Sequence, residues 1–135
     1  MKADSVIIYV DDFECSKAFY GGALGLKMRL DAGNYCEFDI GGLGLGLMSK
    51  KALPYFLGET GREQWKDGAP RCELYFIPDN VEEAVKKIEA AGAQKVADLK
   101  LMPWGDEAAY YRDPDGHIIA LARRTHKFYE LNKLS

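Results

Sequence analysis

Residues 6–25 read VIIYVDDFECSKAFYGGALG, a short apolar run followed by a helical pattern. The run is rich in β-branched residues and predicts a strand. Asp12 is of the type that caps helix N-termini, and Gly25 is of the type that ends helices. Residues 72–92, CELYFIPDNVEEAVKKIEAAG, repeat this order with Asn80 as the cap. The chain therefore begins a strand–helix unit twice, with caps about 68 residues apart.

Three further short strands are predicted after each helix, separated by glycine-rich or Asp-Pro-Asp-Gly turn sequences. Their ranges are 26–30, 35–40 and 43–48 after the first helix, and 93–99, 108–112 and 118–123 after the second. The pattern predicts an α+β fold built from two β-α-β-β-β modules. We expect module one at about 1–49, a connecting flap at 50–70, module two at about 71–125 and a C-terminal tail at 126–135.

Composition limits the classes of function. A length of 135 residues suggests a single domain. A net charge of −3 without a basic run gives no sign of a nucleic-acid partner. The chain has no apolar stretch of about 18 residues and no secretory signal, so we expect no membrane partner and a cytoplasmic location. Three cysteines without a CxxC pair predict neither a disulfide framework nor a zinc site.

The connecting flap at 50–70 holds Pro, Gly and charged residues, but also Tyr55, Phe56 and Trp65. A loop of this length in a compact domain is usually functional or disordered. The aromatic residues favour a flap that closes over a ligand. The alternative is an ordinary surface excursion with a small apolar cluster of its own.

Alternation in residues 43–48, LGLGLM, places leucines on one face of a strand and Gly44 and Gly46 on the other. The leucines should pack against a helix, and the glycines should leave space on the opposite face. A bulge or a close backbone approach explains such glycines equally well.

The other strands repeat this division into a helix face and an opposite face. The opposite faces collect Tyr9, Tyr35, Glu37, Glu73 and Tyr75, with small residues between them. Two such sheets curved toward each other would enclose a pocket with aromatic walls and a few carboxylates, which suits a planar or cationic organic ligand. The alternative is that the carboxylates face water on an open sheet.

Three stretches carry a resemblance to a known family. Residues 10–26, VDDFECSKAFYGGALGL, resemble the V-x-D-x-x-x-S-x-x-F-Y-x-x-x-L-G-L signature of the vicinal oxygen chelate superfamily. Residues 78–93 are similar to its second helix, and residues 104–121, WGDEAAYYRDPDGHIIAL, to its W-G…D-P-D-G ending. This superfamily includes glyoxalase I, extradiol dioxygenases, fosfomycin-resistance proteins and bleomycin-binding proteins. The resemblance covers nearly the whole chain and implies paired modules that form a curved mixed sheet around a cleft.

The resemblance also implies four strand positions that hold one divalent metal in the family's enzymes. Here they fall on Ser5, Gly46, Glu73 and Ala120. A divalent cation needs three or more nitrogen, oxygen or sulfur donors. Glu73 alone cannot supply them, so we expect no metal and no other cofactor.

What remains is the metal-free, bleomycin-resistance-like branch, whose members bind small molecules, commonly as homodimers. We therefore expect a small-molecule binding protein, such as an antibiotic-resistance or sequestration factor. The predicted ligand-binding residues are Tyr9, Tyr35, Glu37, Gly46, Trp65, Glu73, Tyr75, Trp104, Tyr110 and Ala120.

Two other functions stay open. One is a metal-free isomerase, epimerase or lyase that uses Glu73 or Glu37 as a general base, because an apolar pocket can raise the pKa of a carboxylate. The other is an atypical metal-dependent glyoxalase or dioxygenase that uses Glu37, Asp39 and Glu73.

Overall fold

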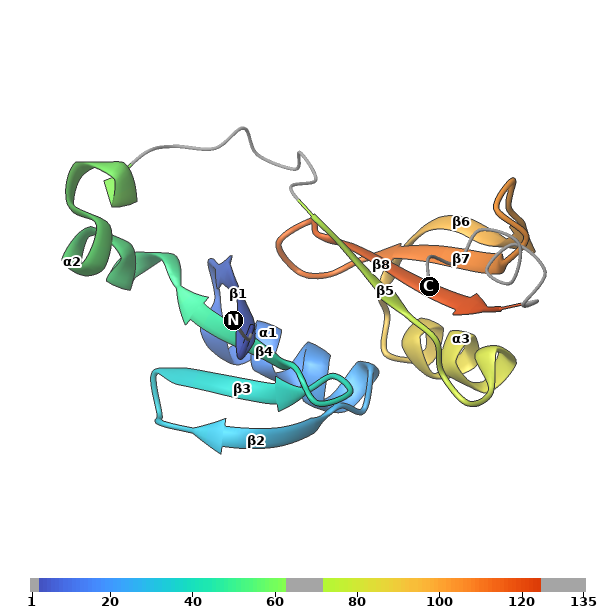
Figure 1. The fold of residues 1–135 in the computed structure, drawn as a ribbon, viewed down its shortest axis with the longest axis horizontal. Helices are drawn as coiled ribbons and strands as arrows, with labels where there is room; N and C mark the ends of the chain where they lie inside the picture. Colours follow the sequence, from blue (N-terminus) through green and yellow to red (C-terminus); the bar gives the residue numbers. More distant parts are fainter. Residues whose placement is uncertain (1–2, 63–71, 125–135) are drawn as a thin grey trace. The chain divides into compact units, whose positions relative to one another are not determined.

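The computed structural model describes residues 3–62 and 72–124, without the side chains of 56–58. Contacts divide the chain into two compact units, residues 1–69 and 70–135. Each unit contains one four-stranded sheet with a helix against one of its faces (Figure 1). The sheets are mixed, with one parallel and two antiparallel pairs each, so the α+β class and the repeated module are confirmed.

Unit one is built in the order predicted from the sequence. Its sheet has the strand order β1-β4-β3-β2, in which β1 runs parallel to β4. The elements are β1 (Ser5–Val10), α1 (Phe13–Ala18), β2 (Lys27–Asp31), β3 (Tyr35–Asp39) and β4 (Gly44–Ser49). Asp12 caps α1, because its carboxylate accepts a hydrogen bond from the Cys15 N–H at 3.0 Å.

The core of unit one lies between the sheet and α1, which packs on β4. The alternating apolar residues of three strands are buried there, and they are Ile8, Val10, Cys36, Phe38, Leu45 and Leu47. The predicted helix face of these three strands is therefore confirmed. Val6 has the same parity but is 45% exposed.

The first helix ends differently from the prediction. An α-helix up to Gly25 was expected, but α1 is followed by a π-helical turn, η1 (Phe19–Ala23). The wider turn is visible in the Leu24 N–H, which donates to the Phe19 carbonyl five residues earlier at 3.1 Å. Gly21 and Gly22 lie inside this turn, and glycine has a low helix propensity.

The described part of the flap, residues 50–62, consists of three short helical segments. These are η2 (Lys50–Ala52), α2 (Leu53–Leu57) and η3 (Gly58–Arg62). Tyr55, one of the aromatic residues expected to cover a ligand, is 88% exposed. Trp65 lies outside the described residues.

Unit two repeats the arrangement with the strand order β5-β8-β7-β6. Its elements are β5 (Glu73–Phe76), α3 (Val81–Ala90), β6 (Gln94–Leu101), β7 (Glu107–Arg112) and β8 (Ile118–Arg123). The helix packs on β8, and the core between them buries Val81, Ile88, Ala109, Tyr111, Ile119 and Leu121.

The Asp-Pro-Asp-Gly segment forms the predicted turn between β7 and β8. Asp113 holds it, because its Oδ1 accepts hydrogen bonds from the N–H groups of Asp115 at 2.9 Å and His117 at 2.8 Å. Gly116 has a φ of 90°, in the left-handed region that favours glycine. The turn thereby sets the register that aligns Tyr110 with Ala120.

Two further expectations can be compared with the described residues. Cys15, Cys36 and Cys72 all lie within them and form no disulfide there. No helix in this part of the chain has both the length and the apolar character needed to cross a membrane.

Replacing Asn80 with alanine tests the cap of α3. The Asn80 side chain accepts a hydrogen bond from the Glu83 N–H at 3.0 Å. Losing such a cap should lower the free energy of unfolding by about 1 kcal/mol. Chemical denaturation of Asn80→Ala and of the control Asp79→Ala, which changes an exposed neighbour, checks this. An equal loss in both variants would contradict the capping role.

Candidate functional site

The face of the unit-one sheet opposite α1 gathers most of the residues predicted from the first module. The register aligns Ile7, Gly46 and Glu37 in one row across β1, β4 and β3. The next row contains Tyr9, Met48 and Tyr35. The structure therefore brings the predicted residues Tyr9, Tyr35, Glu37 and Gly46 to one face.

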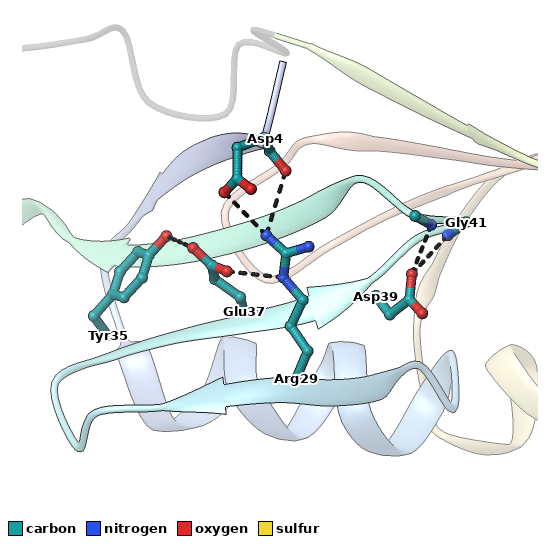
Figure 2. A network of polar contacts seen from close by, with 7 residues as sticks. Asp4, Arg29, Tyr35, Glu37, Asp39 and Gly41 are labelled. Carbon is teal, nitrogen blue, oxygen red and sulfur yellow. Dashed lines mark hydrogen bonds and ion pairs between the residues drawn. The ribbon is translucent and has the colours of Figure 1, made fainter. Parts of the chain in front are cut away.

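A network of polar contacts covers this face (Figure 2). The Arg29 Nε donates to Glu37 Oε1 at 2.9 Å, and its Nη2 donates to Asp4 Oδ2 at 3.2 Å and to the Asp4 carbonyl at 3.3 Å. The Tyr35 hydroxyl donates to the other carboxylate oxygen of Glu37 at 2.5 Å. Glu37 therefore joins the guanidinium to the phenol.

The glycines of β4 make room for this network. A Cβ at Gly44 would lie 2.3 Å from Arg29 Nη2, and a Cβ at Gly46 would lie 2.4 Å from the Tyr35 hydroxyl oxygen. One of the two interpretations of these glycines was that they leave space on this face. Within unit one that interpretation is wrong at Gly44 and Gly46, because Arg29 and Tyr35 take the space directly above them.

The network also sets the ionisation of its members. Hydrogen bonds from Tyr35 and then from Arg29 lower the pKa of Glu37. Burial, followed by the hydrogen bond to Glu37, raises the pKa of Tyr35 to about 12. A general base that works near neutral pH needs a carboxylate with a raised pKa. The surroundings of Glu37 instead lower the pKa of its carboxylate.

The corresponding face of unit two gathers the residues predicted from the second module. Tyr75, Ala120 and Tyr110 are aligned in one row across β5, β8 and β7. Ala108 and Ala122 form the neighbouring pair, and these two alanines and Ala120 have no exposed surface. The half-buried tyrosines thus flank a floor of three small residues.

A hydrogen-bond chain crosses this face. The Trp104 indole N–H donates to the Tyr75 hydroxyl oxygen at 2.9 Å, and the Tyr75 hydroxyl donates to Asp106 Oδ2 at 2.6 Å. Asp106 is fully buried, and Arg124 Nε lies 4.0 Å from the same oxygen. Burial, followed by the hydrogen bond to Asp106, raises the pKa of Tyr75 to about 12, while the Trp104 hydrogen bond acts in the opposite direction.

Glu73 lies in the next row of the same face, two residues before Tyr75 on β5. It is an exposed residue paired in register with Ile118. The predicted residues Tyr75, Trp104, Tyr110 and Ala120 therefore lie together on this face, and Glu73 lies at its exposed edge, where β5 begins. Burial is the first cause of a raised pKa at Tyr110, and the charge of Glu73 is the second.

The sequence analysis missed Arg29 and Asp106. Arg29 lies at a register shift between Met28 and Leu30, so simple alternation does not assign its side chain to a face. Asp106 did have a detectable signal, because it has the same parity as Ala108 and Tyr110 on the following strand.

The four metal positions implied by the resemblance do not fit a divalent cation. Gly46 and Ala120 provide no side-chain donor, Ser5 provides a neutral hydroxyl, and Glu73 is the single carboxylate. The alternative set fits no better: both oxygens of Glu37 are engaged, and Asp39 Oδ1 accepts hydrogen bonds from the N–H groups of Gly41 and Gly42 (Figure 2).

One group of three side chains in the described residues has the spacing of a metal site. It consists of Asp113, Asp115 and His117, whose donor atoms lie within 4.8 Å of one another. Asp113 uses Oδ1 to hold the turn, and its Oδ2 lies 2.7 Å from His117 Nδ1. These contacts of Asp113 stabilise the turn between β7 and β8, and they explain why the three side chains lie close together.

Comparisons with known proteins agree with this architecture. The glyoxalase-like domain family matches residues 3–125, so the chain belongs to that family. The match agrees with the resemblance to the vicinal oxygen chelate superfamily. No curated protein matched the chain.

Several solved structures have the same fold. A protein of unknown function from Agrobacterium tumefaciens str. C58 is 27% identical, with a TM-score of 0.75 over 90% of this chain and 93% of that one. A glyoxalase/bleomycin resistance protein/dioxygenase family enzyme from Burkholderia phytofirmans PsJN is 20% identical, with a TM-score of 0.76 over 89% and 98%. Lactoylglutathione lyase from Agrobacterium tumefaciens is 22% identical, with a TM-score of 0.68 over 99% and 98%. At these identities, the similarity to the last two structures shows a shared fold alone.

Replacing Gly46 with alanine tests the contact above β4. The added Cβ would lie 2.4 Å from the Tyr35 hydroxyl oxygen, so the Tyr35 side chain must shift and its hydrogen bond to Glu37 should weaken. We expect the pKa of Tyr35 to fall from about 12 toward its ordinary value of 10.0, and overpacking to cost roughly 1–3 kcal/mol of stability. NMR titration of tyrosines labelled with ¹³C at Cζ, assigned with Tyr35→Phe, measures the pKa. Gly22→Ala is the control, since a Cβ there meets nothing within 4 Å; an unchanged Tyr35 pKa in Gly46→Ala would refute the contact.

Two variants of the hydrogen-bond chain in unit two should shift the pKa of Tyr75 in opposite directions. Asp106→Asn removes a charge that disfavours tyrosinate, so the pKa should fall from about 12 but stay above 10.0, because burial is its largest cause. Trp104→Phe removes a donor that favours tyrosinate, so the pKa should rise. The same NMR titration, assigned with Tyr75→Phe, decides. If the pKa of Tyr75 shifts in the same direction in both variants, the hydrogen bonds from Trp104 to Tyr75 and from Tyr75 to Asp106 are wrongly assigned.

Proposed function

We propose that this protein is a metal-independent small-molecule binding protein of the glyoxalase-like family. One observation carries the proposal: the positions where the family's enzymes hold a metal provide a single carboxylate, and Tyr35 lies over one of them, Gly46. A metal bound here would lack the donors that its coordination requires.

The character of the two faces supports an organic ligand. Unit one offers Tyr9 and Tyr35, and unit two offers Tyr75, Tyr110 and Trp104, all half-buried. Aromatic side chains with polar tips bind flat organic groups through stacking and hydrogen bonds. In this proposal the aromatic side chains of these faces contact the ligand.

A metal-free enzyme is the second candidate function. One of the proteins with the same fold is named as an enzyme, lactoylglutathione lyase. The candidate base Glu37 has a lowered pKa and both oxygens engaged. The other candidate, Glu73, is exposed, so it lacks the apolar pocket in which a carboxylate acts as a general base. Binding without turnover is therefore the better-supported function.

Metal analysis of the full chain, purified without chelator, tests the proposal. We expect less than stoichiometric metal, and a melting temperature that neither Mn²⁺, Fe²⁺, Ni²⁺ nor Zn²⁺ raises, because binding to the folded state stabilises it by mass action. Protein treated with chelator is the control and should melt at the same temperature. Stoichiometric metal whose removal lowers the melting temperature would overturn metal independence.

A further inference from the structure

One carboxylate oxygen of Asp106 lies buried without a hydrogen bond. Asp106 has no exposed surface. Its Oδ1 accepts no hydrogen bond from any residue in ranges 3–62 and 72–124. Buried polar atoms in native proteins are almost always satisfied, and an exception indicates a bound water, an ion or a functional role.

The other oxygen shows which interaction is lacking. Asp106 Oδ2 already accepts the Tyr75 hydroxyl at 2.6 Å, and the Arg124 guanidinium lies 4.0 Å away. A countercharge is therefore close to the carboxylate. What Oδ1 lacks is a hydrogen-bond donor rather than a further positive charge.

Asp106 lies on the face that gathers the predicted ligand-binding residues of unit two. It has the same parity as Ala108 and Tyr110, and its hydrogen bond with Tyr75 reaches across the same face. Tyr75, Tyr110 and Trp104 are half-buried there, around the floor of small residues. Aromatic rings beside a floor of alanines suit a flat ring, since aromatic pairs favour offset stacking or edge-to-face contact.

We propose that Asp106 Oδ1 accepts a hydrogen bond from an N–H or O–H group at the edge of a planar aromatic ligand that packs against Tyr75 and Trp104. This inference rests on the proposed function and narrows its ligand class. Because Oδ1 itself has no exposed surface, entry requires a side chain to move. The Arg124 side chain is 33% exposed and lies next to the carboxylate, and such rotamer changes are common on binding.

Asp106→Asn separates this role from a structural one. The asparagine oxygen can still accept the Tyr75 hydroxyl, so the hydrogen-bond chain is kept. Its NH₂ group then takes the place of Oδ1, and a donor faces the ligand's donor. Asp79→Asn is the matched control, because it makes the same chemical change at an exposed position of the same unit.

The experiment uses the ¹⁵N-labelled full chain and two pairs of probes. Indole is compared with 1-methylindole, and phenol with anisole, so that each pair differs in one donor. The readout is the indole N–H signal of Trp104, distinguished from that of Trp65 with Trp65→Phe. We expect the donor member of each pair to bind about tenfold more tightly than its methylated partner. This preference should persist in Asp79→Asn and disappear in Asp106→Asn.

The outcomes separate the inference from the function beneath it. If the probes bind but methylation makes no difference, or if Asp106→Asn keeps the preference, Asp106 is not the acceptor and the proposed binding function stands. A water at Oδ1 that ligands do not displace would give this result. If no probe shifts any signal of either unit up to its solubility, the binding function fails and the inference fails with it.

Discussion

A four-stranded sheet with one helix has one face that the helix covers and one that the helix leaves open. In unit one α1 covers the face that carries Phe38, Leu45 and Leu47, and in unit two α3 covers Ile119 and Leu121. The opposite faces are covered by side chains of the strands and their adjoining segments. Apolar surface exposed to water raises the free energy of the folded state, and so do buried backbone groups without hydrogen bonds. The chemistry of this protein follows from how each face is closed.

The two units meet this constraint with different groups. Unit one lays a charged guanidinium over Gly44 and a phenol over Gly46, and joins them through Glu37. Unit two closes its alanine floor with tyrosines and an indole, and buries one carboxylate beneath them. The first arrangement satisfies both carboxylate oxygens of Glu37, whereas the second leaves Oδ1 of Asp106 without a partner among the described residues. Similar modules therefore give one face held by ion pairs and one face with unused hydrogen-bonding capacity.

Most of the fold was predictable because local signals agreed with the tertiary structure. The caps at Asp12 and Asn80 predicted where the two helices begin. The alternation of apolar residues predicted which faces of β1, β3 and β4 are buried against α1. Alternation also placed Tyr35 and Tyr75 on the open faces, and the spacing to Ala120 together with the family resemblance placed Tyr110 there. Alternation failed at Arg29, where a register shift changes which way the chain's side chains point.

Other features depend on contacts that a pattern does not encode. The π-helical turn at Phe19–Ala23 follows from hydrogen-bond geometry around two glycines rather than from spacing of apolar residues. Glycines were expected to leave space, but whether a neighbour fills that space depends on the reach of Arg29 and Tyr35. The partner of Asp106 is 31 residues away, a separation at which single-sequence reasoning has no register to use.

The contact between Tyr35 and Gly46 also links the two positions in any change of function. A carboxylate side chain at position 46 has no room while the Tyr35 hydroxyl lies 2.4 Å from the place of its Cβ. Removing Tyr35 alone takes a hydrogen bond from Glu37 without adding a donor for a metal. Neither single substitution gives a metal-binding face, and residues in contact combine non-additively. A path from this chain to a metal-dependent relative must therefore pass through paired changes, which makes the present arrangement hard to leave one mutation at a time.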